Sequence, residues 1–300
     1  MPEVQQVTLS DPSSSLTATY VPAAGMICTS LSDGDVEYLG QRRGLQAYLT
    51  DGKTMGIPIL YPWANRLSAN QYRVGDTVVD VVPGVNGVRA DAHGAPMHGV
   101  LAANPDWQVT EKTEGALIAD LDWGAHPGLL ATFPFPHRLT MAVTLADRTL
   151  TVATTVTPSG RPHVPLCYGF HPYLTIPDVP REDWRLRTPA MRHLLVDDRG
   201  LPTGESKNWP GGEERLGTTE LDDGFDDVEP GALFTLSGGG RRVDVTFDES
   251  YTAAQLFAPG NDAVVGIEPM AAPTDALRRG NYRMAAPGSP ETATFSIRVG

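Results

Sequence analysis

The sequence of 300 residues has few cysteines and no long apolar run. Cys28 and Cys167 form neither a disulfide framework nor a metal-binding pattern, and such sparse use of cysteine is typical of a reducing cytoplasm. No stretch approaches the roughly 18 consecutive apolar residues that a membrane helix needs. Residues 1–15 have neither the basic region nor the apolar core of a secretory signal. We therefore expect a cytoplasmic protein with no membrane partner.

Basic residues are also in short supply. The chain has 23 Lys and Arg against 36 Asp and Glu, a formal net charge of −13. Nucleic acid is excluded as a partner because its phosphates require a basic face. The same charge disfavours a phosphorylated substrate, although a local pair of arginines could override it. A small neutral molecule fits best.

The common cofactor motifs are missing as well. His93 and His98 lie five residues apart in a loop rich in glycine and proline, and no HxH, HExxH or CxxC pattern accompanies them. The sequence contains no G-x-S-x-G elbow, P-loop or dinucleotide fingerprint. We therefore expect no metal, no cofactor and no nucleophilic chemistry.

The hydrophobic pattern has a period of two. Apolar residues alternate with polar or small ones on both sides of a turn at 146–148, which predicts a hairpin over 139–156. The same alternation recurs at 243–247 and 295–299, and 31 glycines and 26 prolines separate such runs. This pattern predicts an all-β fold, a large antiparallel β-sandwich that forms one domain over 1–300. The polar stretch 199–219 is predicted to be a long surface loop.

Residues 263–269 form an apolar run that ends in a carboxylate and a proline. Proline cannot continue a ladder, so the predicted strand ends there and places Glu268 at the rim of a sheet. Loss of solvation beside apolar surface would raise the pKa of Glu268 toward the range of a general base. The alternative is a glutamate that only ends a strand in solvent.

Two histidines are candidates for the partner acid. His171 lies among aromatics and prolines in 165–173, where one side of the imidazole would be buried, and its ordinary pKa of roughly 6.5 suits proton donation. His98 is flanked by glycine in 93–99, so a ligand could approach the backbone. The alternative in both cases is a structural histidine in a core or a turn.

Five segments in order resemble the aldose 1-epimerase (galactose mutarotase) family, over about residues 25–276. Residues 56–67, GIPILYPWANRL, resemble that family's G-x-P-x-L-x-P-x-x-N-R stretch. His98-Gly99 is similar to its first histidine block, and residues 133–136 are similar to its Y-P-F-P turn. Residues 169–174 are similar to its H-P-Y-F block, and residues 268–270 to its terminal E-P-M. Each segment alone is weak, but their order is specific.

The resemblance implies a galactose mutarotase-like supersandwich and cofactor-free interconversion of the α and β anomers of an aldose. It implies that Glu268 is the base and that His171 is the acid that protonates the ring oxygen. Further roles in binding the sugar fall to His98 near the ring oxygen and to Asn65, Arg66 and an acidic residue in 221–226. The spacing to Phe225 selects Asp222, with Asp223 and Asp226 as alternatives.

Two further expectations concern the edges of the pocket. Trp63 or Phe225 could stack on the apolar face of a pyranose, although an aromatic residue in this setting more often packs in the core. Many relatives carry an arginine shortly after the His-Gly pair, whereas this chain has Val100 to Asn104 there. This departure removes a polar contact and leaves the identity of the sugar open.

Three functions from different classes therefore compete. The first is a mutarotase that acts on a free aldohexose or related sugar, and the protein would be a monomer or a homodimer. The second is a hexose-6-phosphate 1-epimerase, which needs extra basic residues near the pocket, with Arg73, Arg89 and Arg161 as candidates. The third is a non-catalytic sugar-binding protein on the same fold, which would be expected to lack Glu268 or His171.

Overall fold

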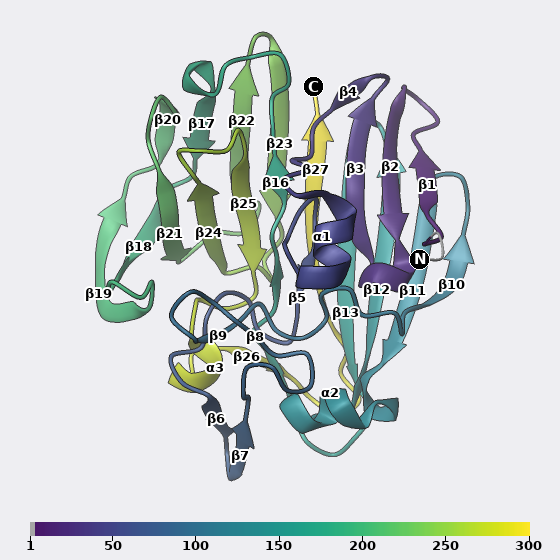
Figure 1. The fold of residues 1–300 in the computed structure, drawn as a ribbon, viewed down its shortest axis with the longest axis vertical. Helices are drawn as coiled ribbons and strands as arrows, with labels where there is room; N and C mark the ends of the chain where they lie inside the picture. The colour runs from purple at the N-terminus through teal and green to yellow at the C-terminus, as the bar shows by residue number, and fades with distance from the viewer. Residues whose placement is uncertain (1–3) are drawn as a thin grey trace.

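The computed structural model describes residues 4–300 and consists mainly of antiparallel strands (Figure 1). The all-β prediction is confirmed. The α-helices are short: α1 (Gly44–Asp51), α2 (Pro127–Thr132) and α3 (Ala276–Arg279). Single 3-10 turns are η1 (Pro22–Ala24), η2 (Trp123–Ala125) and η3 (Arg181–Asp183). Within residues 4–300, no helix has the length and apolar character needed to span a bilayer.

The largest sheet has nine strands. In spatial order they are β10 (Gln108–Lys112), β11 (Ala116–Asp122), β12 (His137–Ala146), β13 (Thr149–Pro158), β27 (Glu291–Val299), β23 (Arg241–Phe247), β22 (Leu233–Gly238), β17 (Arg185–Thr188) and β20 (Gly212–Arg215).

The second large sheet has eight strands. Its strands in order are β19 (Pro202–Trp209), β18 (Met191–Val196), β21 (Leu221–Asp226), β24 (Ala253–Ala258), β25 (Val265–Met270), β15 (Gly169–Phe170) and β5 (Ile59–Leu60), with β16 (Tyr173–Leu174) also on β25.

The remaining strands form smaller sheets. Four strands pair in sequence order: β1 (Val7–Ser10), β2 (Leu16–Val21), β3 (Ile27–Asp33) and β4 (Val36–Glu37). The two-stranded pairs are β6 (Gln71–Val74) with β7 (Thr77–Asp80), β8 (Arg89–Ala90) with β9 (Pro96–Met97), and β14 (Val164–Leu166) with β26 (Arg283–Ala285).

The predicted hairpin over 139–156 is present as β12 and β13. Leu139 lies opposite Val156, and Asp147 and Arg148 form the turn with φ of 50° and 58°. The alternation at 243–247 and 295–299 also lies in strands, β23 and β27. Period-two alternation is therefore a reliable signal where one face of a strand is buried.

The predicted surface loop at 199–219 is wrong. This segment contains β19, which pairs with β18, and β20, which pairs with β17. Both strands lie at the end of a large sheet, and most of their side chains are exposed. The polar composition therefore reflects edge strands, in which polar side chains discourage pairing with another chain.

The predicted end of the strand at Glu268 is also wrong, because β25 continues through Pro269 to Met270. On one side β25 pairs with β24 along its length, and Glu268 lies opposite Gln255. On the other side it pairs with β16 at Gly266 and with β15 at Met270, so residues 267–269 have no partner strand on that side. A proline is tolerated there because no partner strand faces it on that side.

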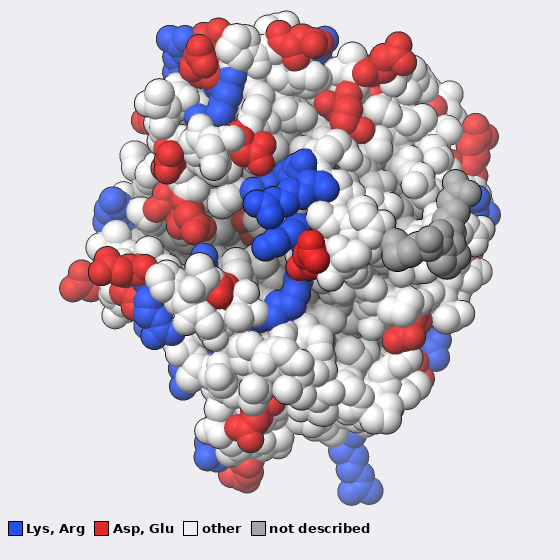
Figure 2. Space-filling model, in the orientation of Figure 1, with Lys and Arg blue, Asp and Glu red and all other residues white. Residues whose placement is uncertain are grey.

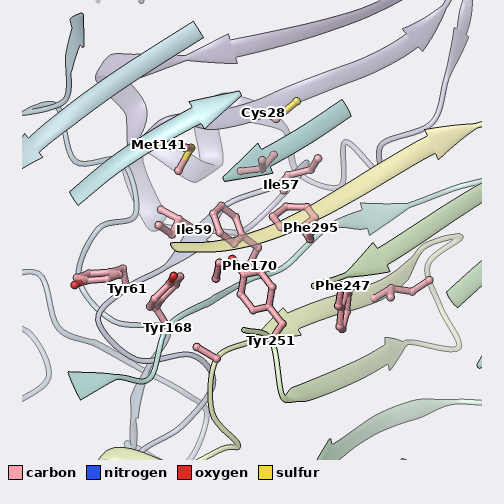
Figure 3. Packing of buried hydrophobic residues seen from close by; sticks show 14 of the residues in the cluster. Cys28, Ile57, Ile59, Tyr61, Met141, Tyr168, Phe170, Phe247, Tyr251 and Phe295 are labelled. Atoms are coloured by element: carbon pink, nitrogen blue, oxygen red, sulfur yellow. The ribbon is translucent and has the colours of Figure 1, made fainter. Parts of the chain in front are cut away.

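The core lies between the sheets (Figures 1 and 3). Figure 3 shows aromatic and aliphatic side chains from different sheets meeting there, such as Phe170 of β15 and Phe295 of β27 with ring centroids 4.9 Å apart. Alternate residues of β12 are buried in the same cluster. Burial of this apolar surface is the main favourable contribution to folding.

One polar pair is buried within this aromatic core. Nδ1 of His137 lies 2.6 Å from the carbonyl oxygen of Phe135 and must donate to it, which leaves Nε2 as an acceptor. The hydroxyl of Tyr61 donates to that nitrogen at 2.6 Å. The imidazole also stacks on Trp123 at 5.2 Å. Burial lowers the pKa of His137 to about 4, so the neutral tautomer is favoured.

Tyr61→Phe should lower the free energy of unfolding by about 1–3 kcal/mol, because Nε2 of His137 would lose its donor in a dry site. Tyr20→Phe is the matched control, since the Tyr20 hydroxyl is also buried but has no hydrogen-bond partner among residues 4–300. Urea unfolding of the two variants measures the difference. Equal losses in the two variants would show that the hydrogen bond contributes nothing.

Candidate active site

A cavity of about 590 Å³ lies where β21, β24 and β25 meet the loops around α1 and β8–β9. All six residues predicted as site residues line it, and they are Asn65, Arg66, His98, His171, Asp222 and Glu268. They come from segments spread over two hundred residues, so only the fold brings them together.

Arg66 is fixed at the cavity wall by carboxylates and by its neighbour. Its Nε donates to Asp91 at 3.0 Å, its Nη1 donates to Asn65 at 3.0 Å, and its Nη2 lies 3.7 Å from Asp222. Asp91 is itself held by the backbone N–H groups of His93 and Ala95. The guanidinium is therefore held in a defined orientation, with donors available for hydroxyl groups.

His98 is brought beside Arg66 by the backbone. Its N–H donates to the carbonyl of Asn65 at 2.8 Å, and Asn65 and His98 both have positive φ, 53° and 60°. Gly99 follows with φ of 63°, and a Cβ there would lie 2.0 Å from the carbonyl oxygen of Tyr61. Any larger residue at position 99 would clash with this carbonyl, so only glycine fits there, which explains the His-Gly pair.

Glu268 and His171 form a buried pair at the wall of the cavity. Nε2 of His171 lies 3.2 Å from Oε1 of Glu268, and the side chains are only 6% and 2% exposed. Oε2 of Glu268 and Nδ1 of His171 have no hydrogen-bond partner among residues 4–300. An unpartnered atom on each member of a buried acid–base pair at a cavity wall makes this pair the candidate for chemistry.

The open stretch of the ladder beside β25 positions this pair. Between β15 and β16 the chain carries His171 past Glu268, and the N–H of His171 donates to the carbonyl of Pro58 at 3.1 Å. The imidazole stacks on Tyr173 with centroids 4.0 Å apart. A Cβ at Gly266 would lie 2.9 Å from Cε1 of His171, so glycine makes room for the ring.

The electrostatics of the pair follow from burial. Burial raises the pKa of Glu268 well above its ordinary value, and the nearby Asp222 raises it further. Burial lowers the pKa of His171 to about 3, and the positive charge of Arg42 lowers it further. Burial, with His171, Arg89 and Arg66, lowers the pKa of His98 well below its ordinary value. The carboxyl group is thus a stronger base and each imidazolium a stronger acid than in water.

The structure distinguishes the three acidic residues of β21. Asp222 lines the cavity and accepts a hydrogen bond from Nε2 of Gln255 at 2.7 Å. Asp223 lies next in the strand and contacts Nε2 of His193 at 2.8 Å, while Asp226 is bound by Arg192 at 2.7 Å. Neither Asp223 nor Asp226 lines the cavity.

Several residues of the cavity wall were not predicted from the sequence. Gln255 was detectable, since it is a lone polar residue in the apolar strand 253–258, but its place opposite Glu268 is set by the register of β24 and β25. Tyr173 of β16 and Phe257 of β24 also line the cavity, and the loops on either side of α1 add residues that no local pattern reveals, which include Arg42, Lys53 and Thr54.

Some expectations about the wall are wrong. Trp63 and Phe225 are buried away from the cavity, and Phe225 stacks on His193 at 5.0 Å instead. Tyr173 and Phe257 are the aromatic residues that line the cavity. Of the arginines proposed to hold a phosphate, only Arg89 lines it, and Arg73 and Arg161 do not. Residues 100–104 do not line it either.

The cavity is large enough for a monosaccharide, and its wall holds one candidate base, Glu268, and two candidate acids, His171 and His98. Arg66, Asn65, Asp222 and Gln255 supply donors and acceptors to bind hydroxyl groups on one side. In residues 4–300 no three His, Cys, Asp or Glu side chains are grouped closely enough to hold a metal ion. The residues present therefore support proton transfer on a polyhydroxylated molecule.

Comparison with known proteins agrees with the geometry. The family model described as aldose 1-epimerase matches residues 5–297. No curated protein matches the chain by sequence. Among solved structures, the Slr1438 protein of Synechocystis sp. PCC 6803 has a TM-score of 0.80 and 23% identity, with 99% of this chain and 96% of that chain covered.

Two more structures carry descriptive names. A galactose mutarotase-like protein of Clostridium acetobutylicum has a TM-score of 0.81 and 17% identity, with 95% of this chain and 93% of that chain covered. The GalM/aldose epimerase homologue of C. elegans has a TM-score of 0.77 and 16% identity, with 99% and 98% covered. At these identities the likeness shows the galactose mutarotase-like fold.

Proposed function

Because the chain belongs to the aldose 1-epimerase family, we propose that it is an isomerase that interconverts the α and β anomers of a free aldose, with no cofactor. The observation that carries the proposal is the buried contact of Glu268 with His171, 3.2 Å apart and each with an unpartnered atom, at the wall of a cavity of about 590 Å³. A protein that only bound sugar would gain nothing from holding such a pair out of water.

The proposed reaction needs two proton transfers. The carboxylate of Glu268 removes the proton from the C1 hydroxyl, and a carbonyl forms at C1. The bond from C1 to the ring oxygen breaks with its electron pair on that oxygen, which takes the proton of His171. Rotation about C1–C2 presents the other face of the carbonyl, and the reverse transfers close the ring as the other anomer. No atom is gained or lost.

The remaining residues bind and orient the sugar in this scheme. His98 would hydrogen-bond near the ring oxygen, and Asn65, Arg66 and Asp222 would bind the other hydroxyls. Support comes from the hydrogen bonds that already hold Arg66 to Asp91 and Asp222 to Gln255, because side chains fixed before binding lose little entropy on binding.

The burial of Glu268 and His171 determines which protonation state of this pair is favoured. The reactant form has an ionised Glu268 and a protonated His171, and the open-chain form has both neutral. Since burial raises the pKa of Glu268 and lowers that of His171, the surroundings favour the neutral pair. The ionised Glu268 and protonated His171 that begin ring opening are therefore the minor form of the resting pair, and the surroundings favour the neutral pair that ring opening produces.

The test is anomer exchange on freshly dissolved α-D-glucose and α-D-galactose, followed by polarimetry and corrected for the buffer rate. We expect acceleration that stays level through neutral pH, because the pair keeps one proton there. The rate should fall at acid pH, where His171, with its pKa of about 3, and Glu268 are both protonated. It should fall at alkaline pH when the pair loses its one proton.

Two results would contradict this proposal. A rate equal to that of buffer on a panel of free aldoses would exclude the activity. A single titration at the ordinary histidine value of about 6.5 would show that His171 is not perturbed by its burial.

A further inference from the structure

Arg42 lines the cavity from the loop that leads into α1. Figure 2 shows Lys and Arg side chains in a row at the centre of one face, beside the position of α1 in Figure 1. The backbone of Arg42 has φ of 45°, a left-handed conformation that is unfavourable for residues other than glycine. The N–H of Gly44 donates to the carbonyl of Gln41 at 2.7 Å and closes the turn. The loop therefore holds Arg42 in place despite an unfavourable conformation.

The guanidinium of Arg42 is the outer layer of a stack that ends at His171. It lies 4.8 Å from the centre of the Tyr173 ring and 5.5 Å from that of Phe257. Tyr173 in turn stacks on His171, with centroids 4.0 Å apart and planes inclined by 16°. An arginine is attracted to the face of an aromatic ring and can lie flat against it. Arg42 therefore supports the aromatic ring against which the imidazole is packed.

Asp262 is the partner of Arg42 and lies in the loop between β24 and β25. Its Oδ2 accepts a hydrogen bond from Nε of Arg42 at 3.1 Å, and the two side chains are 26% and 33% exposed. The salt bridge connects the loop before α1 to the loop before the strand that carries Glu268. A partly exposed salt bridge contributes little to stability. Its consequence here is that one positive and one negative charge are fixed beside the stack.

Several other titratable groups surround His171. Its Nε2 lies 3.2 Å from Oε1 of Glu268 on β25, and its ring centroid lies 5.9 Å from that of His98, which follows β9. Burial lowers the pKa of His171 to about 3, and the charge of Arg42 lowers it further. The other charged or titratable residues that line the cavity are Asp51 at the end of α1, Lys53, Arg66, Arg89 on β8, Tyr173 on β16 and Asp222 on β21. Arg42 and Asp262 can be changed without removing a residue that the proposed reaction uses.

We propose that Arg42 is a positioning residue of the proposed reaction, and that its salt bridge with Asp262 sets the charge beside the acid–base pair. This inference rests on the proposed function. The guanidinium supports the Tyr173 ring against the imidazole, and its positive charge opposes the binding of a second proton by the pair. The pair therefore keeps a single proton, as the proposed reaction requires, down to a lower pH. The negative charge of Asp262 offsets part of this effect.

Two titrations of the acid–base pair test this charge. The pair takes up a second proton at acid pH and loses its single proton at alkaline pH, and NMR of the imidazole nitrogens and carboxyl carbons in the full chain follows both steps. Arg42→Gln should move both titrations to higher pH by about half a unit to one unit, because loss of a nearby positive charge favours the protonated forms. Asp262→Asn should move both to lower pH. If the protein unfolds before the acid titration is complete, the alkaline titration decides.

Further variants separate the charge of Arg42 from a purely structural salt bridge. Combining Arg42→Gln with Asp262→Asn should return both titrations close to their wild-type positions, and Arg42→Lys, which keeps the charge, should leave them there. Arg43→Gln is the matched control, since Arg43 is exposed and lies outside the cavity, and it should move neither titration. Shifts in the same direction in the two single variants, or a double variant displaced as far as either, would overturn the inference.

Anomer exchange of glucose provides the second measurement. The acid and alkaline limits of its pH profile should follow the shifts of the titrations, while KM for glucose stays at the wild-type value. A changed KM with unmoved titrations would make Arg42 a contact of the sugar and would also overturn the inference. The titrations need no turnover, so they decide on the charge of Arg42 even if no aldose reacts, a result that would refute the proposed function itself.

Discussion

Glu268→Gln should reduce the catalysed rate of anomer exchange by about 10² to 10⁴-fold, the usual contribution of a positioned general base. The amide has almost the same shape as the carboxyl group, so the cavity and the contact with His171 are kept. It cannot accept the proton of the C1 hydroxyl. The fall should appear in kcat, because the lost interaction belongs to proton transfer and not to binding of the sugar.

The same variant should be more stable than the wild type at neutral pH. The pKa of Glu268 is raised in the folded protein, so at a pH above its ordinary value the unfolded chain releases the proton more readily. Glu268 therefore contributes stability only at acid pH and costs stability as the pH rises. Glutamine removes this cost, and we expect a gain of about 1–2 kcal/mol, seen as a Tm higher by roughly 2–8 °C.

Glu37→Gln is the matched control, with the opposite pattern. Glu37 lies outside the cavity and accepts hydrogen bonds from the N–H groups of Leu31 and Leu39 at 3.0 and 2.8 Å. Its replacement should lower stability by about 1 kcal/mol and leave the rate unchanged. Activity retained by Glu268→Gln would show that the assigned base is wrong, even if the fold and family are right.

The sequence predicted which residues lie together better than it predicted their setting. The six residues that the motifs marked all line one cavity, because a motif preserves side chains that must meet whatever separates them in the chain. The setting of Glu268 was predicted wrongly for a local reason. Proline normally ends a strand, and only the open ladder beside β25 shows why Pro269 does not.

Residues that depend on register or on loop paths were out of reach. Asp222 and Asp223 are neighbours, and only the pairing of β21 with β24 shows that Asp222 lies opposite Phe257 at the cavity, while Asp223 meets His193. A shift by one residue would have exchanged them. Arg42 and Lys53 flank α1, a short helix whose position over the sheet no pattern in 44–51 predicts. The place of Arg42 and Lys53 at the cavity is therefore a finding of the structure.

His171→Asn should also reduce the catalysed rate by about 10² to 10⁴-fold, because the ring oxygen would lose its proton donor as the ring opens. Asparagine keeps hydrogen-bonding capacity in this place but cannot give up a proton near neutral pH. Polarimetry under the conditions used for Glu268→Gln measures the loss. The two variants together should not lose the product of the single losses, because the acid and the base act on one proton-transfer cycle.

The chain offers a close control in His193. Nε2 of His193 lies 2.8 Å from Asp223, its Nδ1 is buried with no partner among residues 4–300, and its ring stacks on Phe225 at 5.0 Å. It thus reproduces the contact of His171 with a carboxylate and with an aromatic ring, but it lies outside the cavity. His193→Asn should lose comparable packing and keep the rate of the wild type.

The pair of variants separates chemistry from packing. If His171→Asn loses activity and His193→Asn does not, while both fall similarly in Tm, then proton transfer by His171 accounts for the loss. Equal loss of activity in both would mean that the rigidity of the sheet, and not the acid, limits the rate. If the His171→Asn variant kept the rate of the wild type, the proton donor would be His98 instead. Its unpartnered Nδ1 and lowered pKa equip it for the same step.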